Sequence, residues 1–476
     1  MASTNKSRRK FIKNSAIASS IFIVPRNVLG GVGYTPPSDK LNLAGIGLYG
    51  KGQSDIANAC VNGRENVLAL CDVHPSANGV MVSKERFPKA KFYIDFRKML
   101  DKEKDIDAIT ISTPDHTHAV IAKECMERGI HVYVQKPLTH NVKEARLLTN
   151  LARKHKVVTQ MGNQGASNPE QAIIQNWIKD DKIGKIKTVY TWTNRPVWPQ
   201  GIPLHKPDKS KKPKDMNWDL WVGPAKNIEY TPFLHPFDWR GFWDYGTGAL
   251  GDMGCHLMDV PVKALGLFEP YSIEASVPRT PYIKSYTPSS IYDEACPASS
   301  YVTYKFKPSK INDTEVELIW MDGGLRPSHP DGIPENKDIG DNGILMIGEK
   351  GVITASEYGN RARLYIDGKE VTKGKIKDIQ GAEFGHQSSW IDAIKAGFNS
   401  KEQKSLASSF DFAGPLSEIV LLGNVAIRSA LLRRSPRSNV FIGKKQLLYD
   451  NKEMKITNFD NANQFLTRKY REGWEI

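Results

Sequence analysis

Residues 40–72 are the part of the chain that most constrains its fold. An apolar strand pattern runs into Gly45-Ile46-Gly47-Leu48-Tyr49-Gly50, a helical pattern follows, and a second apolar strand pattern ends at Asp72. This is the order and the G-x-G-x-x-G spacing of a dinucleotide-binding βαβ unit, whereas an ordinary glycine-rich turn needs neither the flanking strands nor the acid. The helix after the turn offers unpaired N–H groups and a partial positive charge to a pyrophosphate.

The acid at the end of the second strand indicates which dinucleotide binds. Asp72 comes twenty-two residues after Gly50, where a carboxylate accepts hydrogen bonds from the adenosine ribose hydroxyls. The same charge would repel a 2′-phosphate. We therefore predict NAD in preference to NADP, and the cofactor-binding residues of this unit are Gly45, Gly47, Leu48, Tyr49, Gly50 and Asp72.

The rest of the chain shows two kinds of pattern. Up to about residue 160, strand patterns at 108–112, 130–134 and 157–161 alternate with helical patterns at 120–128 and 142–154, which is typical of a parallel sheet covered on both faces. After about residue 185 the β patterns are longer-spaced and partly alternating, as in an open antiparallel sheet. They lie at 271–277, 300–306, 315–320, 344–347, 352–355 and 363–366, and helical patterns follow at 388–396 and 416–432.

These patterns predict an α/β fold with two domains. A doubly wound parallel Rossmann sheet occupies residues 38–165, and an α/β domain with a large, mostly antiparallel open sheet occupies residues 166–440 and binds the substrate. Residues 441–476 are expected to form a C-terminal extension that packs on the domains.

Part of the basic charge lies in a leader. Of the formal net charge of +14, six positive charges fall in residues 1–33, which hold no acid, and most of the other lysines are scattered as on a solvated surface, so we predict no nucleic-acid partner. Ser-Arg-Arg-Lys-Phe-Ile-Lys at 7–13 precedes an apolar run at 16–24 that is too short to span a bilayer. This leader resembles a twin-arginine export signal more than a disordered basic tail, so we predict a periplasmic protein without a membrane span.

The cysteines give no sign of a metal site. Cys60, Cys71, Cys125, Cys255 and Cys296 show no C-x-x-C spacing and no clustered Cys/His ligand set, so we predict no metal. The first three fall inside apolar patterns, where small buried thiols are expected.

Two residues beyond predicted strand ends carry candidate chemistry. Lys136 follows a strand and precedes Pro137, and a lysine beside a nicotinamide ring can hold a substrate oxygen or move a proton. The alternative is an ordinary surface lysine. His118 is either near the nicotinamide or a capping and packing residue of its helix, and either His118 or His116 is expected to be exposed.

A second cluster suits proton transfer. Asp252 and His256 are four residues apart, so a helix places both on one face. Oxidation of an alcohol needs a group that takes the hydroxyl proton, and histidine suits because its pKa lies near neutrality. Asp259 lies on roughly the same face and is expected to orient the imidazole. The alternative is an acid at a helix start and a histidine satisfied in the core, and metal binding is disfavoured because no third ligand is evident.

Aromatic loops between residues 192 and 245 suggest a carbohydrate site. Sugars have apolar ring faces and polar edges, which tryptophans with nearby arginine and asparagine can match. At least half of these tryptophans are expected to build the core instead. The predicted substrate contacts are Asn163, Arg195, Trp198, Trp239, Arg240 and Tyr245, together with Asp252 and His256.

Together, the segments 41–50, 112–118, 135–137 and 239–259 make the chain similar to the glucose–fructose oxidoreductase, inositol dehydrogenase and rhizopine-catabolism (Gfo/Idh/MocA) family, from about Leu41 to Ala430. The resemblance implies a Rossmann domain followed by an α/β domain whose large sheet forms a homo-oligomer interface. It also implies that exported members act on sugars and glycosides, and that NAD is tightly bound.

The resemblance also assigns roles to single residues. It places Thr113, Pro114 and His118 beside the nicotinamide and makes Lys136 the lysine of the family's Glu-Lys-Pro motif. Asp252 and His256 match its Asp-x-x-x-His pair, with His256 as the acid–base. Gln135 stands here in place of the motif's glutamate, so that negative charge beside Lys136 is missing.

The predicted function is NAD(P)-dependent hydride transfer between nicotinamide and a sugar, sugar alcohol or glycoside, with C3 of a hexopyranoside as the favoured position. His256 would be the acid–base, and Lys136 and Asp252 would hold the reacting oxygen. One alternative is a glycoside hydrolase of the same fold that works by transient oxidation and elimination, with Tyr245 as a candidate base. The other is a non-catalytic sugar-binding protein, which the intact Lys136, Asp252 and His256 argue against.

Overall fold

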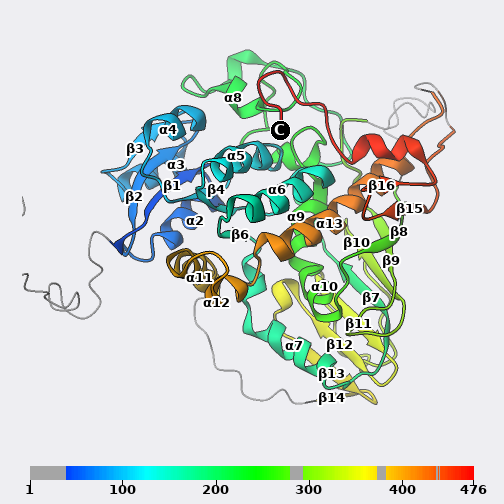
Figure 1. The fold of residues 1–476 in the computed structure, drawn as a ribbon. Helices are drawn as coiled ribbons and strands as arrows, with labels where there is room; N and C mark the ends of the chain where they lie inside the picture. Colours follow the sequence, from blue (N-terminus) through cyan, green and yellow to red (C-terminus); the bar gives the residue numbers. More distant parts are fainter. Residues whose placement is uncertain (1–38, 279–292, 372–381, 436–437, 439) are drawn as a thin grey trace, which may run out of the picture. The chain divides into compact units, whose positions relative to one another are not determined.

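The structure, a computed structural model, describes residues 39–278, 293–371, 382–435, 438 and 440–476. The leader predicted at 1–33 lies outside the described residues. From Asn42 onward the described chain belongs to one compact unit, which contains two sheets (Figure 1).

The first sheet is parallel throughout, with the strand order β3-β2-β1-β4-β5-β6. Its strands are β1 (Asn42–Ile46), β2 (Asn66–Cys71), β3 (Lys91–Tyr93), β4 (Ala108–Ile111), β5 (His131–Val134) and β6 (Thr159–Met161). The helices of this part are α2 (Lys51–Ala59), α3 (Asn78–Arg86), α4 (Phe96–Lys102), α5 (Asp115–Glu127) and α6 (Val142–His155). This order is that of a doubly wound Rossmann sheet, so the predicted fold of the N-terminal part is confirmed.

Local sequence explains why these helices form, and α6 shows it best. Asn141 and Glu144 form a capping box at its start, which satisfies backbone N–H groups that have no partner within the helix. Arg153, Lys154 and His155 in its last turn complement the negative end of the helix dipole.

Helix α5 begins at Asp115, five residues before the predicted helical pattern at 120–128. Its first turn holds Asp115, His116, Thr117 and His118, all of them buried. Polar side chains that face the interior hide the apolar periodicity, so the sequence pattern missed this turn. His116 and His118 are both buried, and the expectation that one of them is exposed was therefore wrong.

The second sheet is mixed but mostly antiparallel, as predicted. Its order is β14-β13-β12-β11-β7-β10-β9-β8-β15-β16, and β7 and β10 are the parallel pair among its strands. The strands are β7 (Ile186–Trp192), β8 (Pro270–Ser276), β9 (Tyr301–Phe306), β10 (Val316–Met321), β11 (Gly343–Gly348), β12 (Val352–Ala355), β13 (Arg363–Ile366), β14 (Lys369–Val371), β15 (Leu447–Asp450) and β16 (Lys455–Ile456).

Strand β7 was not predicted although it lies in the middle of this sheet. Its buried residues are Ile186, Val189, Thr191 and Trp192, which do not follow a regular alternation. The segment 322–342 covers part of this sheet: Ile333 belongs to the same buried cluster as Trp192, and Trp192 Nε1 donates to the carbonyl oxygen of Gly340 at 3.0 Å. The homo-oligomer predicted through this sheet remains a prediction.

Helix α13 (Phe410–Ala430) joins the two parts of the core. It packs on α6, on β8 and on α9 (Gly248–Leu257) (Figure 1). It starts six residues before the predicted pattern at 416–432 because it continues through Pro415, where a helical pattern is normally expected to stop. By length and composition α13 could cross a membrane, but 83% of its apolar window is buried inside the protein, which accounts for its composition.

Candidate active site

A cavity of about 530 Å³ opens where the strands of the first sheet end. Its walls include residues within two positions of the ends of β1 to β5, namely Gly47, Asp72, Ile94, Thr113 and Lys136. The opposite wall comes from the second part of the chain and includes Arg240, Asp252 and His256. Ligands of doubly wound sheets bind beyond the carboxyl ends of the strands, and this cavity is at that place.

The glycine turn fits a pyrophosphate. Gly47 has a φ of 78°, and a Cβ there would lie 2.7 Å from the backbone of Ser112, so only glycine fits. Gly50 has a φ of 61° and nothing within 4 Å of a Cβ position, so space is open beside the start of α2. Helix α2 has no side-chain cap, which leaves its first N–H groups available to a phosphate, and Lys51 adds a positive charge to the wall.

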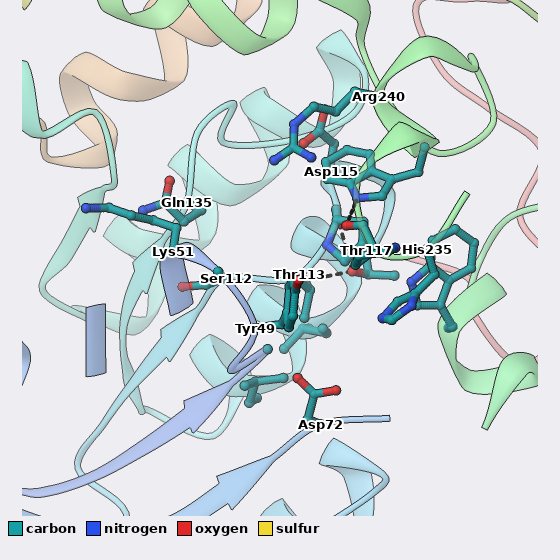
Figure 2. Close-up of a pocket in the computed structure, with 18 of the residues that line it drawn as sticks. Tyr49, Lys51, Asp72, Ser112, Thr113, Asp115, Thr117, Gln135, His235 and Arg240 are labelled. Atoms are coloured by element: carbon teal, nitrogen blue, oxygen red, sulfur yellow. Dashed lines mark hydrogen bonds between the residues drawn. The ribbon is translucent and has the colours of Figure 1, made fainter. Parts of the chain in front are cut away.

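Asp72 lies at one end of the cavity and Arg240 with Asp115 at the other (Figure 2). Asp72 Oδ2 accepts from the backbone N–H of Leu48 at 2.8 Å and Oδ1 from that of His74 at 3.0 Å. These bonds aim the carboxylate, and each oxygen keeps a second lone pair for a ribose hydroxyl. The turn, the helix start and Asp72 together fit NAD.

Lys136 and Asp252 form the polar centre of the site. Lys136 Nζ lies 2.6 Å from Asp252 Oδ1 and 2.8 Å from the Asp252 carbonyl oxygen, and Arg240 Nε lies 3.5 Å from the same Oδ1. Burial by itself would raise the pKa of Asp252, but the charges of Lys136 and Arg240 outweigh it and lower the pKa to about 2. Asp252 is therefore ionised and supplies the negative charge beside Lys136.

Gln135 joins a separate buried network. Its Nε2 donates to Asp55 Oδ2 at 2.8 Å, and Ser112 Oγ donates to the same oxygen at 2.9 Å. Gln387 Nε2 donates to Asp55 Oδ1 at 3.1 Å. Gln135 thus donates to the carboxylate of Asp55 from α2, while Lys136 pairs with Asp252.

His256 lines the cavity one helical turn after Asp252. Burial, followed by the charge of Lys136, holds the pKa of His256 well below its usual range, so the ring is neutral near neutral pH. A neutral ring can accept a proton from a substrate hydroxyl. The backbone holds α9 close to the core at this point, because a Cβ on Gly254 would lie 3.0 Å from Val420 of α13.

Asp259 does not orient His256, which corrects the expectation from spacing. Asp259 Oδ2 accepts from Asn163 Nδ2 at 3.3 Å and from Gln171 Nε2 at 3.2 Å, and Oδ1 lies 3.5 Å from Lys263 Nζ. His256 Nδ1 is buried without a hydrogen-bond partner among the described residues. A new helix, α10 (Asp259–Leu265), begins at Asp259, so the helical spacing from His256 does not carry across the junction.

The neighbour that the structure gives His256 is Tyr358. The two rings meet edge to face, with centroids 4.6 Å apart and an interplanar angle of 79°. Tyr358 has a φ of 63°, which is unusual for a non-glycine residue, and it lines the cavity. Backbone strain of this kind is often found at functional sites.

Several predicted residues line the cavity as expected. These are Gly47, Tyr49, Gly50, Asp72, Thr113, Pro114, Lys136, Arg195, Trp239, Arg240, Asp252 and His256. Arg240 is held over the rings of Trp239 and Phe237, at 4.3 and 4.5 Å from their centroids, which orients its guanidinium next to Asp252.

Three predicted cofactor residues lie behind the cavity wall. A Cβ on Gly45 would press on Leu48 Cδ2 at 3.0 Å, and Leu48 itself is fully buried. His118 is buried between two backbone carbonyl groups, with Nδ1 2.9 Å from Pro137 O and Nε2 2.7 Å from Thr113 O, and burial lowers its pKa to about 4. His118 therefore ties the loop after β4 to the loop after β5 and does not itself face the cavity.

Three predicted substrate residues are also outside the wall. Asn163 is buried and donates to Asp259. Trp198 donates from Nε1 to Gln200 Oε1 at 3.0 Å and packs edge to face on Phe237. Tyr245 is buried against His116 and Trp221 outside the cavity lining, and burial raises the pKa of its hydroxyl, so its position does not favour it as the base of the hydrolase alternative.

The wall residues that the sequence reasoning missed include Lys51, Asp115, Tyr358 and Trp474. Lys51 had a signal, because it directly follows the last glycine of the turn. Asp115 accepts from Thr247 Oγ1 at 2.6 Å, and burial raises its pKa to about 6. Tyr358 and Trp474 come from distant segments without a recognisable motif. Among the described residues no group of His, Cys, Asp and Glu side chains could hold a metal ion.

Comparison with known proteins agrees with this geometry. Residues 41–163 match the Gfo/Idh/MocA model for the oxidoreductase family, NAD-binding Rossmann fold, and residues 176–278 match its C-terminal alpha/beta domain. A segment of 182 residues, 36% of the chain, is 28% identical to a Shewanella (strain ANA-3) protein named glycosyl hydrolase family 109 protein 1. That match spans 39% of the relative's length.

Solved structures share the fold over most of the chain. One is the WlbA dehydrogenase of Chromobacterium violaceum with NADH and UDP-GlcNAcA, with 17% identity and a TM-score of 0.55 over 83% of this chain and 95% of that one. Another is levoglucosan dehydrogenase with NADH and levoglucosan, with 16% identity and a TM-score of 0.54 over 82% and 98%. At these identities the likeness shows the fold. The matches to the two domain models, one for each domain, place the chain in the Gfo/Idh/MocA family of oxidoreductases, with an NAD-binding Rossmann domain.

Proposed function

We propose that the protein oxidises a CH–OH group of a carbohydrate, or reduces the corresponding ketone, with NAD(H). The observation that carries this proposal is the triad of Lys136, Asp252 and His256 in the wall of the dinucleotide cavity. The levoglucosan and UDP-GlcNAcA complexes of fold neighbours support a carbohydrate as the substrate class.

The polar triad handles the hydroxyl oxygen and its proton. Lys136 is fixed by Asp252 and can donate one of its N–H groups to the reacting oxygen. His256 is neutral and accepts the hydroxyl proton as the alcohol becomes a ketone. When bound, NAD supplies the site that accepts hydride. In the reverse direction, His256 returns the proton to the oxygen.

The remaining wall suits a sugar ring. Trp239, Phe237 and Tyr358 offer apolar faces, and Arg195 and Arg240 offer donors to hydroxyl groups. Oxidation at C3 of a hexopyranoside remains the favoured position, since a C3 ketone acidifies the neighbouring C–H bonds.

The second candidate is a glycoside hydrolase that regenerates its NAD in each cycle. Its support is the glycosyl hydrolase family 109 name of the partial relative. After oxidation at C3, a base removes the C2 proton and the C1–O bond to the leaving alcohol breaks. Water then adds at C1, a proton returns to C2, and the ketone is reduced again. Tyr358, which contacts His256 in the cavity, replaces Tyr245 as the candidate base.

One experiment separates these functions. The purified protein is incubated with a panel of hexopyranosides, with and without added NAD, while NADH absorbance and products are followed. A dehydrogenase forms NADH and keto sugar in equal amounts. A hydrolase releases the leaving alcohol without net NADH, and a non-catalytic binding protein does neither. If NAD and sugar both bind but no member of the panel yields NADH, the proposed net oxidation of the sugar is refuted.

A further inference from the structure

The last residues of the chain return to the Rossmann domain. We define residues 466–476 as the C-terminal strap. Figure 1 shows the chain ending close to α8 (Trp218–Val222). Tyr470 Oη donates to Glu144 Oε1 of α6 at 2.8 Å, and Arg468 donates to the carbonyl oxygen of Asp244 at 3.2 Å. The strap therefore contacts both α6 of the first domain and the loop that precedes α9, the helix of Asp252 and His256.

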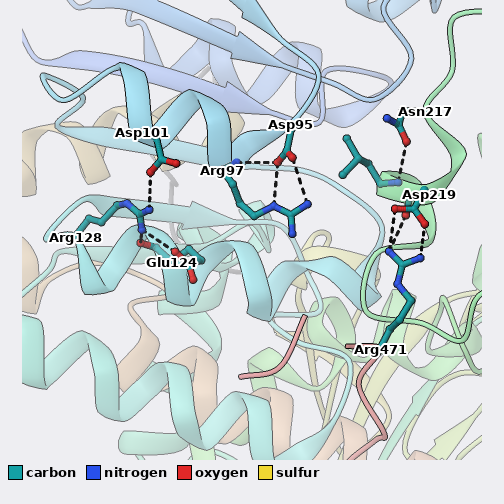
Figure 3. A network of polar contacts seen from close by, with 9 residues as sticks. Asp95, Arg97, Asp101, Glu124, Arg128, Asn217, Asp219 and Arg471 are labelled. Carbon is teal, nitrogen blue, oxygen red and sulfur yellow. Dashed lines mark hydrogen bonds and ion pairs between the residues drawn. The ribbon is translucent and has the colours of Figure 1, made fainter. Parts of the chain in front are cut away.

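An ion pair fixes the strap to α8. Arg471 Nη1 lies 2.6 Å from Asp219 Oδ1, Nη2 donates to the Asp219 backbone and carboxylate, and Arg471 N donates to Pro224 O at 3.1 Å (Figure 3). The Arg471 side chain is 17% exposed and the Asp219 side chain 67%, so the pair is partly open to solvent, and the backbone bond to Pro224 adds to the anchor.

Trp474 follows this anchor and lines the cavity. It is 6% exposed and packs on Phe96 of α4, with ring centroids 6.2 Å apart. The guanidinium of Arg97 lies 4.4 Å from the Trp474 ring and is itself held by Asp95 (Figure 3). The indole therefore has a fixed position, which is what a binding wall needs.

The place of Trp474 identifies the part of the ligand that it faces. Trp474 lines the cavity together with Ile94, Asp95 and Phe96, which follow β3. Strand β3 is the neighbour of β2, whose end carries Asp72, and Lys136 follows β5 on the other side of β1. Ile94 is 42% exposed, so this corner has apolar surface without cover. The part of NAD that extends beyond the ribose at Asp72 is the adenine ring, and this apolar corner suits it.

We propose that Trp474 is a wall of the adenine subsite and that the Arg471–Asp219 anchor slows release of the dinucleotide. The strap lies outside both segments that match the family models, and it would help the protein to retain its cofactor. The inference depends on the proposed function only through the cofactor, so it is tested with ADP-ribose, which has an adenine ring and no nicotinamide.

The test measures the affinities of ADP-ribose and nicotinamide mononucleotide for wild type, Trp474→Ala and Trp474→Phe. Loss of a base–aromatic contact lowers affinity by roughly tenfold to a hundredfold. We expect that loss for ADP-ribose in Trp474→Ala, most of it restored in Trp474→Phe, and no change for nicotinamide mononucleotide. A folded Trp474→Ala protein that binds ADP-ribose as wild type does would overturn the inference.

The release of NADH tests the anchor. Arg471→Ala should release NADH several times faster than wild type in a displacement experiment followed by NADH fluorescence. Arg433→Ala is the matched control, because it removes another Arg–Asp pair, with Asp293, from residues that do not line the cavity. Equal release rates in Arg471→Ala and Arg433→Ala would contradict the anchoring role.

A measurement on the unmodified protein keeps the inference testable if Trp474→Ala does not fold. Amide hydrogen exchange of residues 466–476 should slow when ADP-ribose binds and should not respond to nicotinamide mononucleotide. Exchange that is insensitive to ADP-ribose, or equally sensitive to both ligands, would refute the proposal. Neither result depends on turnover, so a failure of the proposed sugar oxidation would be seen separately.

Discussion

Single carboxyl groups at the site differ in how firmly they hold their protons. The pKa of Asp252 is about 2 because Lys136 and Arg240 offset its burial, and the pKa of Asp115 is raised to about 6, mainly by burial. The two acids lie in the same cavity wall, yet their pKa values are shifted in opposite directions. Asp252 gives a constant charge above pH 4, whereas Asp115 changes its charge near pH 6.

Asp115 makes the stability of the protein depend on pH. Its pKa is raised from 3.8 to about 6 on folding, so the folded state binds this proton more tightly than the unfolded chain does. The contribution of this group to the free energy of unfolding is fully present below pH 3.8 and is lost as the pH rises through about 6. Asp115→Asn keeps an acceptor for Thr247 and should remove this loss. The stability that the wild type loses in this way amounts to roughly 3 kcal/mol at most, since each pKa unit is worth about 1.4 kcal/mol.

The measurement is the melting temperature of both proteins between pH 4 and pH 7. The exposed Asp313 provides the control Asp313→Asn, which makes the same chemical change at the surface. Parallel pH profiles for wild type and Asp115→Asn would show that burial does not perturb this group.

Asp72 should decide between the two nicotinamide dinucleotides. Its carboxylate is fixed by the N–H groups of Leu48 and His74 at the end of β2. Asp72→Ser should narrow the preference for NAD over NADP by about tenfold or more, because like charges a few ångströms apart repel by more than 1.4 kcal/mol in a partly buried site. Titration of both dinucleotides measures this, and tighter binding of NADP to the wild type would contradict the assignment.

At the scale of elements, the site depends on how closely the turn after β1 approaches β4. A Cβ on Gly47 would lie 2.7 Å from Ser112, and the residue has a φ of 78°. Gly47→Ala should therefore reduce NAD affinity by at least ~10-fold and lower the melting temperature, since the left-handed conformation alone costs about 1–2 kcal/mol.

Gly63 is the matched control for Gly47. It has a φ of 85° and nothing within 4 Å of a Cβ position, and it does not line the cavity. Gly63→Ala should lower stability through its backbone conformation only and leave NAD affinity unchanged. Equal effects of the two substitutions on NAD titrations would mean that the close approach to Ser112 is unimportant.

Local motifs were predictable from sequence because their chemistry is read over a few residues. The glycine turn with Asp72, the Lys136-Pro137 junction and the Asp252–His256 spacing all meet at one cavity. Of the two alternatives for His118, the structure favours the packing residue, because α5 begins earlier than its pattern and turns that side chain inward. The prediction that Asp259 orients His256 failed because a new helix starts at Asp259.

Contacts between distant segments were not predictable in this way. Tyr358 contacts His256 from a short helical turn about one hundred residues later, and Trp474 returns from the end of the chain. The close position of Tyr358 also requires Gly165, because a Cβ there would lie 2.6 Å from Tyr358 Cβ. Such complementarity appears only when both segments are folded.

At the scale of the whole molecule, α13 holds the two domains together, and the cavity lies between their residues. The parallel sheet and the antiparallel sheet were each predictable from patterning. The strands β3, β7, β14, β15 and β16 were missed, since they are short or do not alternate.

We propose that the leader predicted from the sequence directs the protein to the periplasm. Arg8 and Arg9 in residues 1–33 form the predicted twin-arginine signal. That route carries folded proteins, so the protein should reach the periplasm with NAD already bound. Replacing both arginines with lysine should retain the protein in the cytoplasm, as measured by cell fractionation. Undiminished export of the double variant would exclude the twin-arginine route.

The proposed chemistry is tested most directly by a single turnover of His256→Ala. With NAD bound and a saturating sugar substrate, NADH absorbance reports the oxidation step alone. If His256 accepts the hydroxyl proton, the rate should fall by ~10²–10⁴, the usual worth of a positioned acid–base, while NAD affinity and melting temperature stay near those of wild type. A folded His256→Ala enzyme that reduces its NAD at the wild-type rate would contradict the account.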